Sequence, residues 1–514
     1  MFLRSTLLVF STVAAFAVAQ RAFAQAPQQG PPQASQATPL PLSGRSGQSG
    51  SATAIEAPSP GLTSSINTLN TSVQIQGPYQ GSVRGAAKPL SGKLTLRDAI
   101  ARGLEHNLGT VGLTEAIRQA HGQMRMARSS LLPNLSAALR ESVQQIDLQA
   151  LGLRFNTPIP GFTVPTIVGP FNYFDLRSTL TQKVFDLTAL NNYRSARELV
   201  QANTAAMHDA RDLVAYAVTG AYLQAMAAEG RLAAAHARVD TAAALLKQTQ
   251  DRKSVGLAAA IDVNRSTIEW QTEQQRITTL ENDLAKQKIN LARLIGFPPS
   301  GSYQLAGELP PSAPVDLSFD RALTQAVENR FDLKAAEAQL RAAERTKAAA
   351  TAERLPSLDV SADYGAIGIN PAQSHGTFTF VGTLRVPIWN GGKTGGSIEQ
   401  AEAALAQRRA ELEDTRGRIE SDVRQALLDL ETTRKQMDLA INNKRVARET
   451  LELTRQRLGA GVTDTIEVVQ TQESVATADF DYISSVFSYN LAKATLARAI
   501  GNTEANLERF LALP

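Results

Sequence analysis

The stretch Asn290-Leu291-Ala292-Arg293-Leu294-Ile295-Gly296 recurs 205 residues later as Thr495-Leu496-Ala497-Arg498-Ala499-Ile500-Gly501. Residues 94–135 also align with residues 317–358 without a gap, at an offset of 223. Self-similarity of this length indicates one structural unit written twice. The sequence therefore predicts two repeats of the same fold.

Each repeat contains a long stretch without proline, at residues 171–297 and 388–513. These stretches are rich in Ala, Leu, Gln, Glu and Arg, which favour helix. In each we expect one helix of about 65 residues, roughly 97 Å long, and a shorter returning helix. Gly256 and Gly461 are predicted to end the long helices, because glycine readily adopts the left-handed conformation found at helix C-termini. The expected helices cover residues 191–255, 261–295, 397–460 and 465–500. Taken alone, these stretches would also fit a plain coiled-coil rod.

Four segments between the helices alternate apolar and polar residues with a period of two. The clearest runs from Leu358 to Tyr364, and the others lie at residues 174–184, 378–388 and from Leu135, where the alternation is lost at Glu141. This period is typical of a half-buried strand. In an exported protein it also fits a membrane β-barrel, with apolar residues toward lipid. A soluble sandwich would show the same alternation, so the pattern alone leaves both open.

The number of strands constrains a barrel. One chain offers four, and an open edge would leave backbone donors unpaired in lipid. Bacterial membrane barrels begin at about eight strands, so a barrel made from this chain requires an oligomer. Residues 148–170 and 367–376 would form the outer loops of the two hairpins, the first being the longer.

Composition excludes several classes of protein. The chain has 514 residues, no cysteine and a formal net charge of +4. Without cysteine there is no disulfide, thiolate metal site or cysteine nucleophile. Beyond the first 20 residues there is no apolar run of about 18, which excludes a polytopic helical membrane protein. The small charge and the lack of a basic run with interleaved aromatics argue against a nucleic-acid partner.

The N-terminus has the features of an export signal. Arg4 supplies the positive charge, residues 7–19 form the apolar core, and Ala22-Phe23-Ala24 fits the cleavage rule. The Pro-, Gln-, Ser- and Gly-rich segment that follows has too little apolar surface to order itself. The expected organisation is a signal peptide at 1–24, a disordered segment at 25–92, a first repeat at 93–300, a linker at 301–316, a second repeat at 317–503 and a C-terminal tail at 504–514.

Signals of catalysis are weak throughout. Residues 390–394 resemble part of a phosphate-binding loop, but Pro387 stands where that loop requires glycine. The five histidines have no metal-ligand spacing. No Gly-x-Ser-x-Gly elbow is present. We therefore expect no enzyme activity, no cofactor and no metal site.

Several motifs together carry a resemblance to a known family. They are Leu132-Pro133-x-Leu135 and Leu355-Pro356-x-Leu358 entering strands, Leu180-x-Gln182-x-Val184-Phe185-Asp186 and Val386-Pro387-Ile388-Trp389-Asn390-Gly391-Gly392 leaving them, and Tyr489-Asn490-Leu491-Ala492 before the last repeated stretch. In this order, spacing and duplication, residues 94–501 resemble the TolC-type outer-membrane efflux proteins.

The resemblance implies a fold and a function. The fold is α plus membrane β-barrel, a homotrimer in outer-membrane lipid in which each chain adds four strands to a 12-stranded barrel. A long α-helical barrel would continue it into the periplasm, with the shorter helices, here 96–130 and 257–295, stacked end to end beside the long ones. The function implied is a passive exit duct of a tripartite efflux or secretion system, working with an inner-membrane transporter and a periplasmic adaptor protein. The alternative is a periplasmic structural or adaptor-like coiled-coil protein, against which the duplicated hairpins with strands between helices argue.

The resemblance also assigns the two helix-to-helix turns to the periplasmic tips. The residues expected to contact the adaptor are Val255, Gly256 and Leu257 in the first turn and Ala460, Gly461 and Val462 in the second.

Acidic residues after the second turn narrow the entrance of the duct in this family. Glu467 matches the first acidic position, Gln470 stands where another acid can lie, and Asp464 is a candidate to compensate. Three converging glutamates would repel one another and attract cations. For Glu467 a solvated carboxylate at a helix start is an equal alternative, and for Asp262, the counterpart in the first repeat, it is the preferred one.

Overall fold

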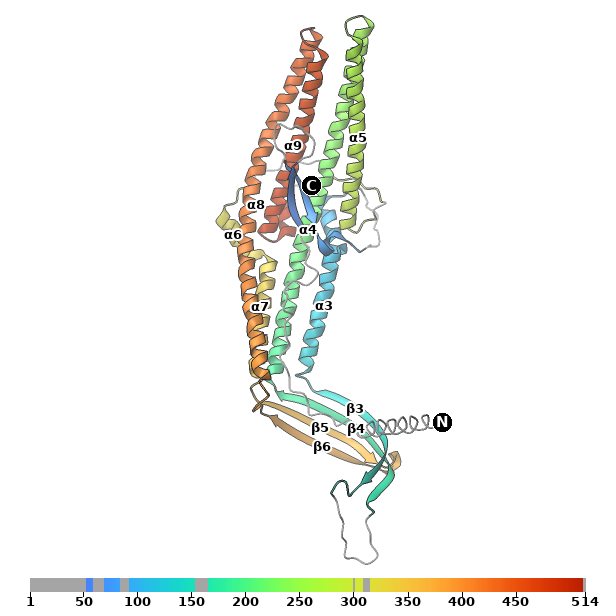
Figure 1. Ribbon diagram of the computed structural model, residues 1–514, viewed down its shortest axis with the longest axis vertical. Coiled ribbons are helices and arrows are strands. Elements are labelled where there is room, and N and C mark those ends of the chain that lie inside the picture. The colour runs from blue at the N-terminus through green and yellow to red at the C-terminus, as the bar shows by residue number, and fades with distance from the viewer. Residues whose placement is uncertain are drawn as a thin grey trace, which may run out of the picture. The chain divides into compact units, whose positions relative to one another are not determined.

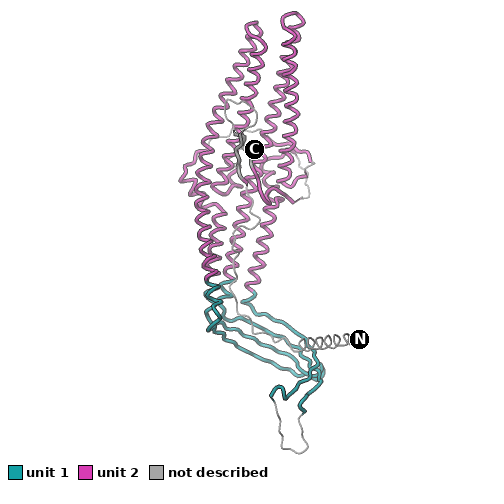
Figure 2. Tube along the Cα trace, viewed as in Figure 1, with its two compact units in different colours: residues 1–38, 129–192, 347–398 teal, residues 39–128, 193–346, 399–514 magenta. Residues whose placement is uncertain are grey.

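The computed structural model describes residues 52–58, 69–83, 92–152, 165–298, 301–307 and 315–511. The chain divides into two compact units (Figure 2). Most of the strand unit comes from residues 129–192 and 347–398, and the helical unit comes from residues 39–128, 193–346 and 399–514. The predicted signal peptide at 1–24 lies outside the described residues.

The strand unit contains one antiparallel sheet in the order β3-β4-β5-β6. Its strands are β3 (Asn134–Asp147), β4 (Ile167–Phe185), β5 (Ser357–Gly368) and β6 (Ser374–Arg385), and Figure 1 shows them side by side. The four predicted strands are therefore confirmed. β3 continues past Glu141, where the alternation is lost, and its register shifts between Gln144 and Ile146.

The two faces of the sheet differ in chemistry. Leu135, Leu180, Ala362 and Phe380 lie opposite one another across the four strands, so they share one face. The large apolar residues on that face are exposed: Leu135, Leu139, Leu176, Leu180, Tyr364, Phe378, Phe380 and Leu384. On the other face Arg177 forms ion pairs with Asp175 at 3.3 Å and with Asp363 at 2.9 Å. One face of the sheet is thus apolar and the other is polar.

The helical elements occur in the same order before and after residue 315, with matched lengths. The first set is α2 (Leu96–His106), α3 (Leu108–Ser129), α4 (Leu187–Ser254) and α5 (Ala260–Leu294). The second set is α6 (Phe319–Asn329), α7 (Phe331–Ala352), α8 (Lys393–Gly459) and α9 (Thr465–Ala499), followed by α10 (Thr503–Leu511). α4 has 68 residues and α8 has 67, and α5 and α9 have 35 each. Within the described residues, none of these helices combines the length and apolar character needed to cross a membrane.

The helix expected over residues 96–130 is interrupted at Asn107, which was not predicted. Asn107 has an extended backbone (φ −64°, ψ 135°) and is 1% exposed. Its side-chain amide donates to the carbonyl of Tyr79 at 2.8 Å, and its Oδ1 accepts from the amide of Gly109 at 2.9 Å. Arg330 makes the corresponding break between α6 and α7. A side chain that satisfies the freed backbone groups makes such a break inexpensive.

Part of the segment expected to be disordered is ordered. Residues 52–58 (β1) pair with residues 69–75 (β2), and η1 (Gly77–Gln80) follows. Tyr79 is 7% exposed and packs over Gly109, where a Cβ would lie 2.2 Å from its ring. Burial of this aromatic ring offsets the ordering entropy in a way that segment composition does not reveal. The expectation for residues 25–92 is therefore wrong for these ranges.

Two large hydrophobic clusters and a small third one, made of Leu245, Leu451, Leu458 and Val468, lie among the described residues of the helical unit. One large cluster joins α2, α4, α5, α9 and α10 through residues such as Ile100, Val214, Leu291, Leu491 and Leu507. The other large cluster joins α6, α7, α8 and α9 through residues such as Ala326, Leu333, Val423 and Leu496. α9 contributes to both large clusters, which explains why it is buried on most sides. The predicted tail at 504–514 is largely α10, whose Leu507 and Leu511 are fully buried.

Candidate functional site

The turn after α4 ends the helix at Gly256. Gly256 has φ +77°, its amide donates to the carbonyl of Lys253 at 3.0 Å, and the amide of Leu257 donates to Arg252 at 2.8 Å. This pair of bonds is the Schellman arrangement, which needs a left-handed residue that glycine supplies without strain. The predicted helix end is confirmed.

The turn after α8 repeats this geometry at Gly461. Gly461 has φ +73°, and its amide donates to Leu458 at 3.1 Å while the amide of Val462 donates to Arg457 at 3.0 Å. The two halves of the chain therefore end their long helices by the same device.

Both turns expose apolar side chains. Val255 and Leu257 are 68% and 69% exposed, and Val462 is 68% exposed. Ala460 is exposed beside Gly461. Exposed apolar residues gathered in one place are a common feature of protein contact sites.

The acidic residues after the second turn have specific partners. Asp464 is the N-cap of α9, and its Oδ1 accepts from the amides of Ile466 and Glu467, each at 3.1 Å. Glu467 forms an ion pair with Arg457 at 2.8 Å and accepts a hydrogen bond from the hydroxyl of Thr463. Gln470 is exposed. Asp464 is thus a capping residue, while Glu467 is already paired within the chain.

Asp262 has the local role that was preferred for it. Its Oδ2 accepts from the amide of Ala259 at 3.2 Å, and its Oδ1 lies 3.7 Å from Arg265. A carboxylate here satisfies an unpaired amide at the start of α5 and interacts favourably with the helix dipole.

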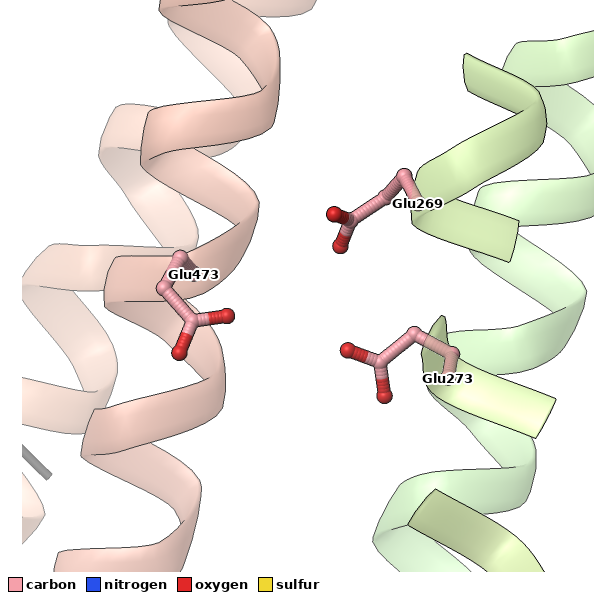
Figure 3. A group of neighbouring side chains, drawn as sticks. All are labelled: Glu269, Glu273 and Glu473. Atoms are coloured by element: carbon pink, nitrogen blue, oxygen red, sulfur yellow. The ribbon is translucent and has the colours of Figure 1, made fainter. Parts of the chain in front are cut away.

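Sequence reasoning did not find the group of carboxylates formed by Glu269, Glu273 and Glu473. Glu269 and Glu273 come from α5 and Glu473 comes from α9, and they lie close together (Figure 3). Burial raises the pKa of Glu273, against the lowering effect of Arg238 and Arg276. Burial and then the charge of Glu273 raise the pKa of Glu269. The i, i+4 spacing of Glu269 and Glu273 was visible in the sequence, but the contribution of α9 was not.

Comparison with known proteins agrees with the repeated architecture. The pattern of the outer membrane efflux protein family matches residues 114–297 and again residues 322–502. Together these matches cover more than half of the chain. The chain belongs to the outer membrane efflux protein family.

As a member of this family, the protein lies in the outer membrane and extends into the periplasm. It is a channel for efflux transport. The family is one of channels rather than enzymes. The TolC-type resemblance is confirmed.

Relatives and solved structures agree with this assignment. The chain is 25% identical to the pyoverdine export outer membrane protein OpmQ of Pseudomonas putida, over 78% of this chain and 84% of the relative. It is 25% identical to the outer membrane protein OprJ of Pseudomonas aeruginosa, over 79% of this chain and 84% of the relative. Its fold is similar to that of the outer membrane protein VceC of Vibrio cholerae, with a TM-score of 0.66, 18% identity and coverage of 79% and 96% of the two chains.

Proposed function

We propose that this member of the outer membrane efflux protein family is the passive exit duct of a tripartite efflux or secretion system. Three copies form the duct, and an inner-membrane transporter and a periplasmic adaptor protein work with it. In this proposal the duct is passive, and the inner-membrane transporter supplies the energy for transport.

The observation that carries this proposal is the four-stranded sheet with one apolar and one polar face. Within the described residues, β3 and β6 each pair on one side only. In lipid such edges need partners, and three copies would supply a closed barrel of twelve strands. The exposed apolar face then meets lipid, and the face with Arg177, Asp175 and Asp363 lines the lumen.

Trp389 supports the membrane assignment of this sheet. It follows β6, is 87% exposed, and is preceded by Ile388, which is 95% exposed. Trp389 is therefore not part of a core within the chain. An exposed tryptophan near the end of a membrane strand is typical of the interfacial aromatic belt.

The two helix turns are the proposed adaptor contacts. Val255, Gly256 and Leu257 form one contact, and Ala460, Gly461 and Val462 form the other. Their support is the shared Schellman geometry and the exposed apolar side chains, which offer a docking partner the same apolar turn twice in each chain. The names of the relatives mention pyoverdine, toluene and antibiotics. This range fits a duct whose selectivity comes from the pump that it serves.

The entrance is proposed to be narrowed after the second turn, by Glu467 with Asp464 and Gln470. Asp464 caps α9, and Glu467 forms an ion pair with Arg457. The net charge at this position therefore depends on how far Arg457 balances Glu467 in each chain. The entrance would then select cations weakly, and Arg457 would control how weakly.

The experiment that tests the duct is extraction followed by mass and conductance measurement. We expect the protein to leave the membrane only with detergent, to have the mass of a trimer and to form pores in a planar bilayer. A protein released without detergent, as a monomer or dimer without conductance, would contradict the proposal and favour a periplasmic coiled-coil protein.

A further inference from the structure

The connection from β6 to α8 differs from its counterpart in the first repeat. Residue 186 alone separates β4 from α4, whereas residues 386–392 separate β6 from α8. Gly391 and Gly392, with φ +66° and +88°, lie at the end of this longer connection. Residues 386–392 form a junction segment between strand and helix that the first repeat does not have.

A cavity of about 280 Å³ adjoins the junction segment. Its lining includes Asp186, Glu353, Arg385, Lys393 and Thr394, all of which belong to the strand unit. A water molecule occupies ~30 Å³ in the liquid, so the cavity has the volume of about nine waters. This is enough for a phosphate group with part of its hydration shell.

The carboxylates of the lining are engaged within the chain, and its cations are not. Asp186 pairs with Lys183 at 3.1 Å and accepts from the amide of Ala189 at 2.9 Å. Glu353 also has a partner within the chain. The side chains of Arg385 and Lys393 form no ion pair or hydrogen bond with any of the described residues. Their charges are therefore available to an anion from outside the chain.

The first repeat shows that the fold does not require these cations. At the offset of 204 that relates the ends of β4 and β6, Arg385 corresponds to Thr181 and Lys393 corresponds to Ala189. Ala189 is 3% exposed, so the first repeat packs a small apolar side chain where the second presents an exposed lysine. Both repeats build the strand and the helix, yet only the second has positive charge at these two positions. This difference favours a role in binding.

Exposed apolar side chains lie between the two cations in the sequence. Ile388 is 95% exposed, Trp389 is 87% exposed and Val386 is 53% exposed. Tryptophan gathers at membrane–water interfaces, and Lys and Arg beside apolar surface keep their charged ends in the polar layer. The junction segment thus combines apolar and cationic groups in the way that suits a lipid surface.

The place of the junction segment in the chain puts it at the level of lipid headgroups. The protein lies in the outer membrane and extends into the periplasm. The inference rests on the proposed function, in which the sheet crosses the membrane and the helices extend from it. β6 then ends at the periplasmic surface of the membrane, where phospholipid headgroups present phosphate, and anionic headgroups attract Lys and Arg.

We propose that Arg385 and Lys393 bind the phosphate of an anionic phospholipid in the cavity beside the junction segment. The guanidinium of Arg385 offers paired donors that match two phosphate oxygens, and Lys393 adds a second positive charge. Ile388 and Trp389 contact the lipid below its headgroup. A zwitterionic lipid binds more weakly, because its own ammonium group competes for the phosphate. Each chain of the duct would hold one such lipid.

The test is lipid binding by the full-length, detergent-purified protein, followed by native mass spectrometry. Dioleoylphosphatidylglycerol is expected to fill a saturable site on each chain, and dioleoylphosphatidylcholine at the same concentration should bind about fivefold more weakly or less. Millimolar inorganic phosphate should not displace the bound lipid, because it lacks the apolar part that Ile388 and Trp389 contact.

Variants separate the site from a general attraction of positive charge for lipid. Arg385→Gln and Lys393→Gln should each weaken phosphatidylglycerol binding about fivefold, as expected for the loss of one cation at a membrane surface, and leave phosphatidylcholine binding unchanged. Arg354→Gln is the matched control. Arg354 is exposed and follows Glu353 in the chain, but it does not line the cavity, so its loss should have little effect.

Three results would overturn the lipid site. They are equal binding of the two lipids to the native protein, an equal loss with Arg354→Gln, and displacement of the lipid by inorganic phosphate, which would indicate a site for free anions. Mass and conductance of the same preparation keep the proposed function separate. A conducting trimer without lipid preference contradicts the lipid site alone, whereas a protein that forms no pore contradicts the duct on which the site rests.

Discussion

Arg457 and Glu467 form an ion pair of 2.8 Å across the turn that joins α8 to α9. The hydroxyl of Thr463 donates to the other carboxylate oxygen of Glu467. Both side chains of the pair are partly exposed, so the interaction is weak. Arg457 nevertheless balances the charge of Glu467 within a single chain. The charge at the proposed entrance is therefore set by two residues rather than by one.

Replacement of Arg457 by glutamine is expected to raise the cation preference of the pore. Loss of the guanidinium leaves Glu467 unbalanced, and an exposed pair contributes about 0.2–1 kcal/mol, which corresponds to at most about a fivefold change in the ratio of cation to anion permeability. The reversal potential in a KCl gradient across a planar bilayer measures this. Glu467→Gln should lower the preference and the block by divalent cations. Unchanged ion selectivity in both variants would contradict the proposal that Arg457 and Glu467 lie at the entrance.

A charge placed on the exposed tip residues should prevent adaptor docking. Val462→Asp is preferred to a change at Gly461, since Gly461 has φ +73° and any side chain there also strains the turn. Replacement of an apolar contact residue by a charged one is expected to weaken adaptor binding about tenfold or more. Export in cells and adaptor pull-down measure the effect.

The control for the tip variants is assembly. Val462→Asp and Leu257→Asp should leave the detergent-extracted mass unchanged, because both side chains are exposed. Normal export with either variant would contradict docking at that turn.

Arginine on the two faces of β6 should have opposite consequences. Phe380 lies on the apolar face and Thr379 lies on the face of Asp363, its partner in the register. Phe380→Arg is expected to destabilise the membrane-inserted protein by about 2–4 kcal/mol if the position lies near the bilayer midplane. Thr379→Arg should cost much less, because it faces water. Urea-induced unfolding in lipid vesicles compares the two, and equal effects would argue against a lipid-facing apolar surface.

Because of Lys493, the free energy of unfolding of the protein should increase with pH in the alkaline range. It is 1% exposed on α9, and burial lowers its pKa to about 8. A lysine in the unfolded chain keeps its proton up to about pH 10.4, so between pH 8 and that value the unfolded state binds more protons than the folded state. Stability should therefore increase with pH in this window.

The measurement for Lys493 is thermal unfolding at pH 8 and pH 10. Lys493→Met should remove this contribution, so the variant gains less stability than the native chain between the two values. The same pH dependence in both proteins would show that Lys493 is charged in the folded state.

Much of the architecture could be predicted from local patterns. The stops at Gly256 and Gly461 followed from the rarity of left-handed backbone in other residues, and the strand from Leu358 followed from its period of two. The break at Asn107 could not be predicted, because it depends on Tyr79 and Gly109, and Tyr79 lies in a segment whose composition favours disorder. Long-range partners decide such positions, and local composition does not contain them.

The candidate site divides in the same way. The position of Glu467 after the second turn was apparent from the spacing to Gly461, whereas its pairing with Arg457 depends on how the chain reverses direction. The group of Glu269, Glu273 and Glu473 needs α5 and α9 to pack in one register, and no periodicity within either helix specifies that register.

The sequence by itself determined the repeated order of helices and strands, the ends of the long helices and the membership of an outer-membrane channel family. These properties depend on the period of the apolar residues, on glycine at the helix ends and on the internal repeat. Each of these can be recognised within one segment or by comparing one segment with its repeat. The tertiary structure alone decided which charges meet. An ion pair or a carboxylate group depends on distances of a few ångströms between segments some 200 residues apart, and those distances are fixed only when the hydrophobic faces of the helices pack.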